Sequence, residues 1–127
     1  MPDFECIEID SVSNVSVVKL KDEKVMAPAR IETLGVELLS LVETEPADDQ
    51  DVAAVNVLIN FENVRFFSSG AINKLIVLEK RVRACGGQIR LSNMHPEVRD
   101  LFSYTNLDSM FDIRNGQTEA MESFEEN

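Results

Sequence analysis

The chain has 127 residues and a net charge of −11, with 44% hydrophobic and 28% charged residues. This length suits one domain with its own core, and the acidic charge argues against direct nucleic acid binding, because phosphate backbones recruit basic surfaces. Two cysteines and a single histidine, His95, argue against a disulfide framework, a zinc site and a Ser-His-Asp hydrolase.

The N-terminal part of the chain predicts a β-hairpin followed by a helix. Apolar and polar residues alternate in residues 4–12 and again in residues 15–20, which is typical of two strands joined by a turn at residues 13–14. Pro28 precedes apolar residues at helical spacing from Ile31 to Val42. The next segment, ETEPADDQD, is rich in carboxylates. It lacks the glycine and the bidentate glutamate of a calcium loop, so we expect a charged loop.

The remaining chain alternates strands and helices. AAVNVLINF (residues 53–61) is short and rich in Val and Ile, as expected for a strand covered on both faces, with Asn60 near its end. QIRLSN predicts a short strand, Pro96 the first turn of a third helix, and MFDI an edge strand. Between AAVNVLINF and QIRLSN the sequence predicts a second helix, which Gly86-Gly87 ends. Its inward side is a stripe of residues at helical spacing: Ala71, Leu75, Leu78, Val82 and Cys85.

These elements predict an α/β fold. A mixed β-sheet of four to five strands begins with the hairpin and continues with alternating strands and helices, and the helices pack on the sheet. We expect a single domain over residues 1–115, and an acidic tail or a short terminal helix over residues 116–127. The N-terminus has no export signal and no apolar stretch approaches membrane-spanning length, so we expect a cytoplasmic protein without membrane contact.

The segment NVRFFSSGAINKL (residues 63–75) places two serines where the buried strand gives way to the second helix. Ser68 or Ser69 can cap the helix by accepting hydrogen bonds from its free N–H groups, which is worth about 1 kcal/mol. A nucleophilic serine needs a neighbouring base, and the pattern is not the Gly-x-Ser-x-Gly elbow. A third interpretation is a phosphate acceptor, because a helix terminus favours the added negative charge.

The chain resembles a STAS domain of the bacterial anti-sigma factor antagonist type from about Phe4 to Ile113. In the segment VLINFENVRFFSSGAINKL, Asn60 matches the family's polar residue at the strand end, and Val64 and Phe66 match two hydrophobic positions. Ser69 falls on the family's phosphorylated serine. Downstream, the helix, the Gly-Gly pair, the strand and a P-x-V-x-x-L-F pattern follow in the family's order.

Three positions depart from the family's pattern. Ser68 stands in place of the usual Asp, Gly70 in place of Ser or Thr, and Ala71 in place of Gly. Loss of the acidic residue removes a charge beside the acceptor and leaves Ser68 as an alternative phosphorylation site.

The resemblance implies a partner-switching mechanism. The unmodified domain would bind an anti-sigma factor, which is a serine kinase of the GHKL type, and thereby release a sigma factor. The kinase would phosphorylate Ser69 and so release the antagonist, and a metal-dependent protein phosphatase would reset it. In this scheme the protein is a substrate and a binding module, not an enzyme. It is expected to be a monomer or a weak dimer, with no cofactor and no metal.

We expect the partner to dock on the start of the second helix and on the connection over residues 62–67. Lys and Arg gather on the outward side of this helix, in contrast with the acidic chain as a whole. The expected partner-binding residues are Asn60, Arg65, Phe67, Ser68, Gly70, Asn73, Lys74 and Val77.

Two other functions remain open. One is an unphosphorylated STAS scaffold or regulatory module in a signalling assembly, which the departures at Ser68 and Gly70 favour. The other is a small hydrolase that uses Ser69, with His95 brought near it by the fold. Nucleotide binding is not expected, because the chain has no Gly-rich loop of the kind that cradles phosphates.

Overall fold

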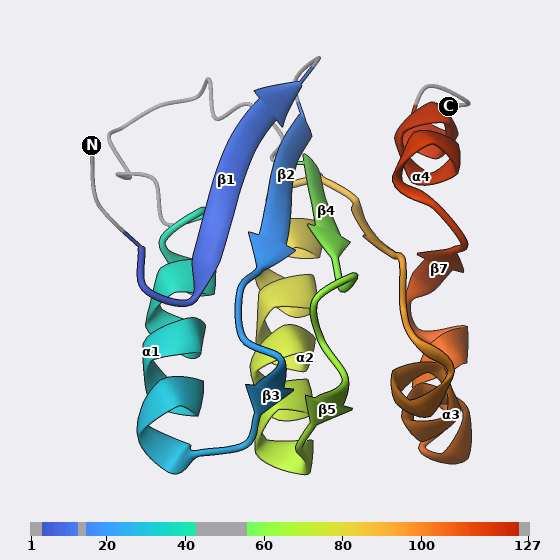
Figure 1. The fold of residues 1–127 in the computed structure, drawn as a ribbon. Coiled ribbons are helices and arrows are strands. Elements are labelled where there is room, and N and C mark those ends of the chain that lie inside the picture. The colour runs from blue at the N-terminus through green and yellow to red at the C-terminus, as the bar shows by residue number, and fades with distance from the viewer. Residues whose placement is uncertain (1–3, 13–14, 43–55, 125–127) are drawn as a thin grey trace.

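The computed structural model describes residues 4–12, 15–42 and 56–124, and Figure 1 shows their arrangement. The predicted turn at residues 13–14 and the predicted charged loop at residues 43–51 lie outside the described residues. In chain order the elements are β1 (Ile7–Val12), β2 (Val15–Leu20), β3 (Lys24–Val25), α1 (Pro28–Leu39), β4 (Asn56–Asn60), β5 (Phe66–Phe67), α2 (Ser69–Ala84), β6 (Ile89–Ser92), α3 (Pro96–Tyr104), the 3₁₀ helix η1 (Leu107–Ser109), β7 (Asp112–Arg114) and α4 (Gln117–Phe124).

Five strands form a mixed sheet in the order β1-β2-β4-β6-β7. β1 and β2 are antiparallel, with Ile7 opposite Leu20, and the other three pairs are parallel. A helix lies in each connection between parallel neighbours: α1 before β4, α2 before β6 and α3 before β7. The predicted α/β fold, with an N-terminal hairpin and then alternating strands and helices, is confirmed.

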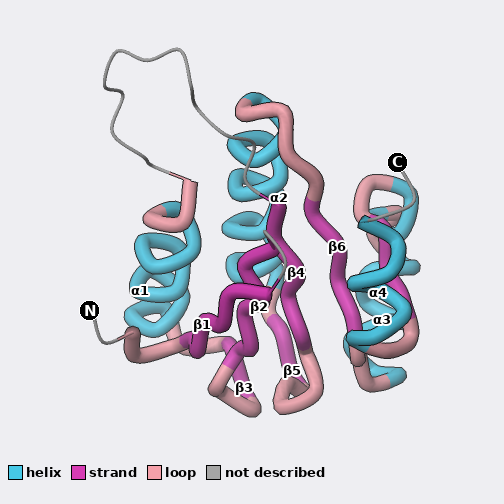
Figure 2. The backbone as a smooth tube through the Cα atoms, turned by 90° about the horizontal axis from the view of Figure 1, so that it is seen from above, coloured by secondary structure: helices cyan, strands magenta, loops and turns pink. Residues whose placement is uncertain are grey.

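Alternate residues of the central strands face two different cores, because successive side chains of a strand point to opposite faces. Val18 and Ile59 are fully buried in the larger core, which α1, α2 and α3 share. Val17 and Leu58 face a smaller cluster around Ala120 of α4. Seen from above, α1 and α2 lie together on one side of the strands (Figure 2). The strand predicted within residues 53–61 is therefore covered on both faces.

The helix boundaries follow local chemistry. Pro28 and Pro96 are the first residues of α1 and α3, where the missing proline N–H costs no intrahelical bond. Gly86, with φ +81°, follows the end of α2 and donates its N–H to the Arg83 carbonyl. Cys85 is half-buried at the C-cap. The rest of the predicted stripe is confirmed as buried: Ala71, Leu75, Leu78 and Val82.

Two features were not predicted. β3 and β5 pair in parallel as a separate two-stranded sheet, and η1 precedes β7. Within residues 116–127, where the sequence left an acidic tail or a short terminal helix open, residues Gln117–Phe124 form the helix α4. Ala120 and Ser123 of α4 are 0% and 2% exposed, so the packed fold extends past residue 115. None of the described helices has the length and apolar character that a membrane crossing needs.

A carboxylate of α1 anchors the start of the sheet. Glu37 is 9% exposed, and its two oxygens accept hydrogen bonds from the backbone N–H groups of Glu5 at 2.7 Å and Cys6 at 2.9 Å. Burial raises the pKa of the nearby Cys6 thiol. The Glu37 side chain thus satisfies two donors that no strand partner satisfies.

Candidate functional site

The two serines at the start of α2 have different roles in the structure. Ser68 is the N-cap, with extended backbone angles, and its Oγ accepts a hydrogen bond from the Ala71 N–H at 3.3 Å. Ser69 is the first helical residue and is exposed. Among the residues that the structure describes, its hydroxyl has no hydrogen-bond partner. The capping interpretation therefore applies to Ser68, and Ser69 is the serine whose hydroxyl is exposed at the start of α2.

Backbone hydrogen bonds hold the segment before Ser69 against β3. The N–H groups of Arg65 and Phe66 donate to the Glu23 carbonyl at 2.8 and 3.1 Å, and the Ser68 N–H donates to the Val25 carbonyl at 3.1 Å. These bonds continue the parallel β3–β5 pair. The position of Ser69 is thus determined by the pairing of the adjacent strand β5 with β3, which comes from a distant part of the chain.

The strand pair turns the two adjacent phenylalanines in opposite directions. Phe67 is 6% exposed, and its ring centroid lies 5.4 Å from that of Phe61 and 6.4 Å from that of Phe102. Phe66 is 46% exposed, and the Lys24 ammonium lies 5.6 Å from its ring centroid.

Met26, just after β3, is also largely exposed, at 52%. We call Met26, Phe66 and Ser69 the acceptor surface. The expected partner-binding residues did not include Met26 and Phe66, which the structure leaves exposed. The sequence indicated that Phe66 and Phe67 face opposite ways, because neighbouring residues of a strand do so. It did not show which of the two faces outward.

The structure separates the expected partner-binding residues by exposure. Asn60 is 2% exposed and Phe67 is 6% exposed, so neither presents its side chain at the surface. This corrects the expectation that both are contact residues. The side-chain amide of Asn60 forms its hydrogen bonds inside the fold, with Gln117 and the Glu62 backbone. The Phe67 ring packs in the aromatic core. Arg65, Gly70 and Asn73 are exposed, and Ser68, Lys74 and Val77 are partly buried.

Ion pairs reduce the basic character of the outer face of α2. The Lys74 ammonium lies 3.2 Å from the Glu32 carboxylate of α1, and Arg83 pairs with Glu79 one turn earlier. The Lys74 stem crosses Gly35, where a Cβ atom would lie 2.7 Å from Lys74 Cδ. The local positive charge that a phosphate would meet is therefore smaller than the sequence alone indicates.

His95 is placed by a backbone contact. Its Nε2–H donates to the Glu62 carbonyl oxygen at 2.7 Å, because a carbonyl can only accept. This nitrogen is therefore not available as a base for Ser69. In the described part of the chain, no three His, Cys, Asp or Glu side chains are grouped so that they could hold a metal ion.

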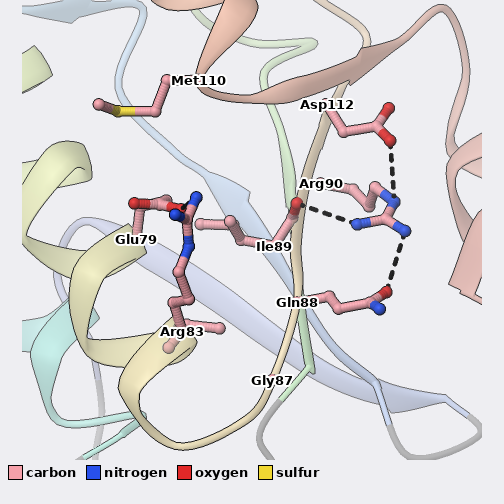
Figure 3. Close-up of a pocket in the computed structure, with 9 residues that line it drawn as sticks. Glu79, Arg83, Gly87, Gln88, Ile89, Arg90, Met110 and Asp112 are labelled. Carbon is pink, nitrogen blue, oxygen red and sulfur yellow. Dashed lines mark hydrogen bonds and ion pairs between the residues drawn. The ribbon is translucent and has the colours of Figure 1, made fainter.

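A second candidate site is a cavity of about 220 Å³ between α2, β6 and β7 (Figure 3). Glu79, 5% exposed, pairs with Arg83 on one wall. On the other wall, Arg90 donates to Gln88 at 2.9 Å and lies 3.4 Å from the Asp112 carboxylate. Each charge among these five residues already has a partner, so a ligand would have to break an ion pair to bind. We assign this cavity a structural role.

Comparison with known proteins places the chain in a family. The model of the STAS domain matches residues 7–120. BtrV of Bordetella bronchiseptica, a candidate anti-sigma factor antagonist by name, is 24% identical over 83 residues, which are 65% of this chain and 72% of BtrV.

Several solved structures share the fold, and two of them illustrate the similarity. An anti-sigma-factor antagonist (STAS) domain protein from Planctomyces limnophilus has a TM-score of 0.80 at 20% identity, over 94% of this chain and 97% of its own. The Bacillus cell fate determinant SpoIIAA, in its phosphorylated form, has a TM-score of 0.64 at 18% identity, over 92% and 97% of the two chains. The fold and the match over residues 7–120 together show that the chain belongs to the STAS domain family.

Proposed function

We propose that this protein is a phosphorylation-controlled anti-sigma factor antagonist. The unmodified protein binds an anti-sigma factor, a serine kinase of the GHKL type, and the bound kinase releases its sigma factor. Phosphorylation of Ser69 by that kinase ends the complex, and a metal-dependent protein phosphatase restores the unmodified form. The observation that carries the proposal is the exposed Ser69 hydroxyl, which has no hydrogen-bond partner among the described residues and stands beside a serine that already caps the helix.

The start of α2 can accept a phosphoryl group without refolding. Phosphorylation would add a charge of about −1.5 to −2. Free N–H groups and the helix dipole favour an anion there, and the first turn of α2 carries no acidic residue to repel it. The added charge would therefore act on a docked partner rather than on the fold.

The acceptor surface supplies the area for docking. Phe66 and Met26 are 46% and 52% exposed, and a docked partner would remove these apolar side chains from water, which favours binding. Arg65, next to Phe66 in the chain, and Asn73, four residues after Ser69, are exposed polar residues. A phosphate on Ser69 would place a strongly hydrated dianion at the edge of this apolar area. The partner would then have to desolvate that charge, which weakens binding.

The relatives support this role. BtrV is named as an antagonist of an anti-sigma factor, and SpoIIAA, which has the same fold, is known in both an unphosphorylated and a phosphorylated form.

The proposal is tested by incubating the protein with ATP and a cell extract of its source organism, then mapping phosphopeptides by mass spectrometry. Phosphate is expected on Ser69, and Ser69→Ala should abolish it while leaving the fold and partner binding intact. Ser69→Asp should weaken partner binding. Ser68→Ala is the matched control and should still be phosphorylated. Phosphate found on Ser68 alone would refute the assignment.

A second candidate function is an unphosphorylated scaffold or regulatory module with the same fold. The departures at Ser68 and Gly70 favour it, because Ser68 lacks the negative charge of the usual Asp and Gly70 contributes no side chain beside the acceptor. In this case Ser69→Ala and Ser69→Asp would bind the partner equally well, and no kinase or phosphatase gene would be expected beside the gene for this protein.

A further inference from the structure

A buried amide links the C-terminal helix to the connection that leads to Ser69. Asn60, the last residue of β4, is 2% exposed. Its Oδ1 accepts the Glu62 backbone N–H at 2.8 Å, and its Nδ2 donates to Gln117 Oε1 at 2.9 Å. The Asn60 side chain thus has one hydrogen bond into the connection and one to the first residue of α4.

Glu62 is a point where several elements meet. Its carboxylate pairs with Lys19 of β2 at 3.1 Å, and its carbonyl accepts from His95 at 2.7 Å. The Phe61 N–H donates to the Ser92 carbonyl at the end of β6. The first half of the connection is therefore positioned by side chains from other elements, whereas β3 positions the second half.

α4 depends on docking for its own stability. It has eight residues, and isolated helices of this length are not stable in water. Its contacts with the sheet are few and specific: Ala120 packs on Leu58, Ser123 Oγ accepts from Arg90 at 2.7 Å, and the Phe124 ring lies 4.8 Å from the Arg90 guanidinium. Docking of α4 is therefore what brings Gln117 to Asn60.

We propose that Gln117 is a positioning residue for the acceptor connection. Gln117 of the docked α4 accepts a hydrogen bond from the Asn60 side-chain amide, and Asn60 accepts one from the Glu62 backbone N–H. These two bonds fix the position of Glu62, from which the connection to Ser69 starts. The inference rests on the proposed function only in naming Ser69 as the group that is presented. Loss of the hydrogen bond between Gln117 and Asn60 would leave the residues of the acceptor surface the same, but the position of that surface would be less well fixed.

The first test measures amide hydrogen exchange in the full-length protein. Gln117→Ala should speed exchange at the Glu62 N–H by about fivefold, the factor expected when one hydrogen bond is lost. Gln117→Glu retains an acceptor for Asn60 Nδ2 and should keep the protection of wild type, whereas Gln117→Met fills similar space without that acceptor and should exchange as fast as Gln117→Ala. Wild-type protection in Gln117→Met would show that the residue only fills space and would overturn the inference. Thr118→Ala, an exposed neighbour on the same helix, is the matched control and should exchange like wild type.

A second variant keeps the test decisive if Gln117→Ala also disturbs the helix. Ala120→Asp places a charge in the smaller core and should undock α4 while leaving the Gln117 side chain intact. The Glu62 N–H should then lose protection as well. Wild-type exchange at Glu62 in Ala120→Asp, or equal exchange in Gln117→Ala and Gln117→Glu, would overturn the inference.

The functional consequence is read out by the rate of Ser69 phosphorylation in the cell extract described above, which Gln117→Ala should lower. If wild-type protein is not phosphorylated, the proposed function fails but the exchange result still decides the role of Gln117. If wild type is phosphorylated and Gln117→Ala shows faster exchange at Glu62 with an unchanged rate, the role of Gln117 in presenting Ser69 is refuted.

Discussion

Alanine substitution of the two adjacent serines should affect stability very differently. Ser68→Ala removes the N-cap acceptor of α2. The bond to the Ala71 N–H is 3.3 Å long, beyond the usual range, so we expect a loss of about 1 kcal/mol, in the lower half of measured cap effects. Ser69→Ala removes an exposed hydroxyl without a described partner and adds the best helix former, so its stability should stay within about 0.3 kcal/mol of wild type.

The assay is urea unfolding followed by circular dichroism, with the slope m checked to be equal in all variants. A loss of about 1 kcal/mol should also lower the melting temperature by about 4 °C in a chain of this size. Equal losses in the two variants, or a loss in Ser69→Ala alone, would contradict the division of roles between the serines.

Three further predictions and one control variant, Glu32→Gln, concern stability. Glu37→Gln should cost about 2 kcal/mol, because an amide supplies one acceptor where the carboxylate supplies two to buried N–H groups. Glu32→Gln, on the exposed side of the same helix, should cost less than about 0.5 kcal/mol. Gly70→Ala should stabilise the protein by about 0.5 kcal/mol, since its new Cβ would lie 3.5 Å from the nearest atom and alanine favours the helix. In Asp112→Asn, the free energy of unfolding should fall less steeply with decreasing pH in the acid range than it does in wild type. Hydrogen bonds from Arg114 lower the folded-state pKa of Asp112, so the stabilisation that this pair contributes is present above the ordinary carboxyl pKa of about 4 and is lost as the pH falls below it.

Urea midpoints measured at several pH values test these predictions together. A Glu37→Gln variant as stable as Glu32→Gln would show that the buried carboxylate is not an anchor. Destabilisation by Gly70→Ala would mean that the start of α2 is more crowded than the structure indicates. If the stability of Asp112→Asn falls with decreasing pH as steeply as that of wild type, the Asp112–Arg114 pair does not contribute the predicted stabilisation.

Much of the fold could be predicted from the sequence, because burial of one face imposes a period on each element. The α2 stripe from Ala71 to Val82, the alternation in β1 and β2, and the prolines at the starts of α1 and α3 are local signals of this kind. β3 and β5 were missed because each has two residues, too few to show a period.

The candidate site could be predicted only in part. The position of a serine pair at a strand-to-helix junction was visible in the sequence and was confirmed. The expected contact residues included Phe67 rather than Phe66, because the direction of each ring depends on how β5 pairs with β3. Asn60 was expected among the partner-binding residues. Its hydrogen bond to Gln117 inside the fold could not be predicted, because Gln117 lies 57 residues further along the chain.

By itself, the sequence determined the order of strands and helices, the apolar faces that they bury and the place of the two serines, because these depend on neighbours a few residues apart. Only the tertiary structure decided that Ser68 caps α2 while Ser69 is exposed, that Phe66 faces outward and that α4 reaches the connection before Ser69 through Gln117. These outcomes depend on strand pairing and helix docking between distant segments, and no local pattern encodes which distant segments will meet.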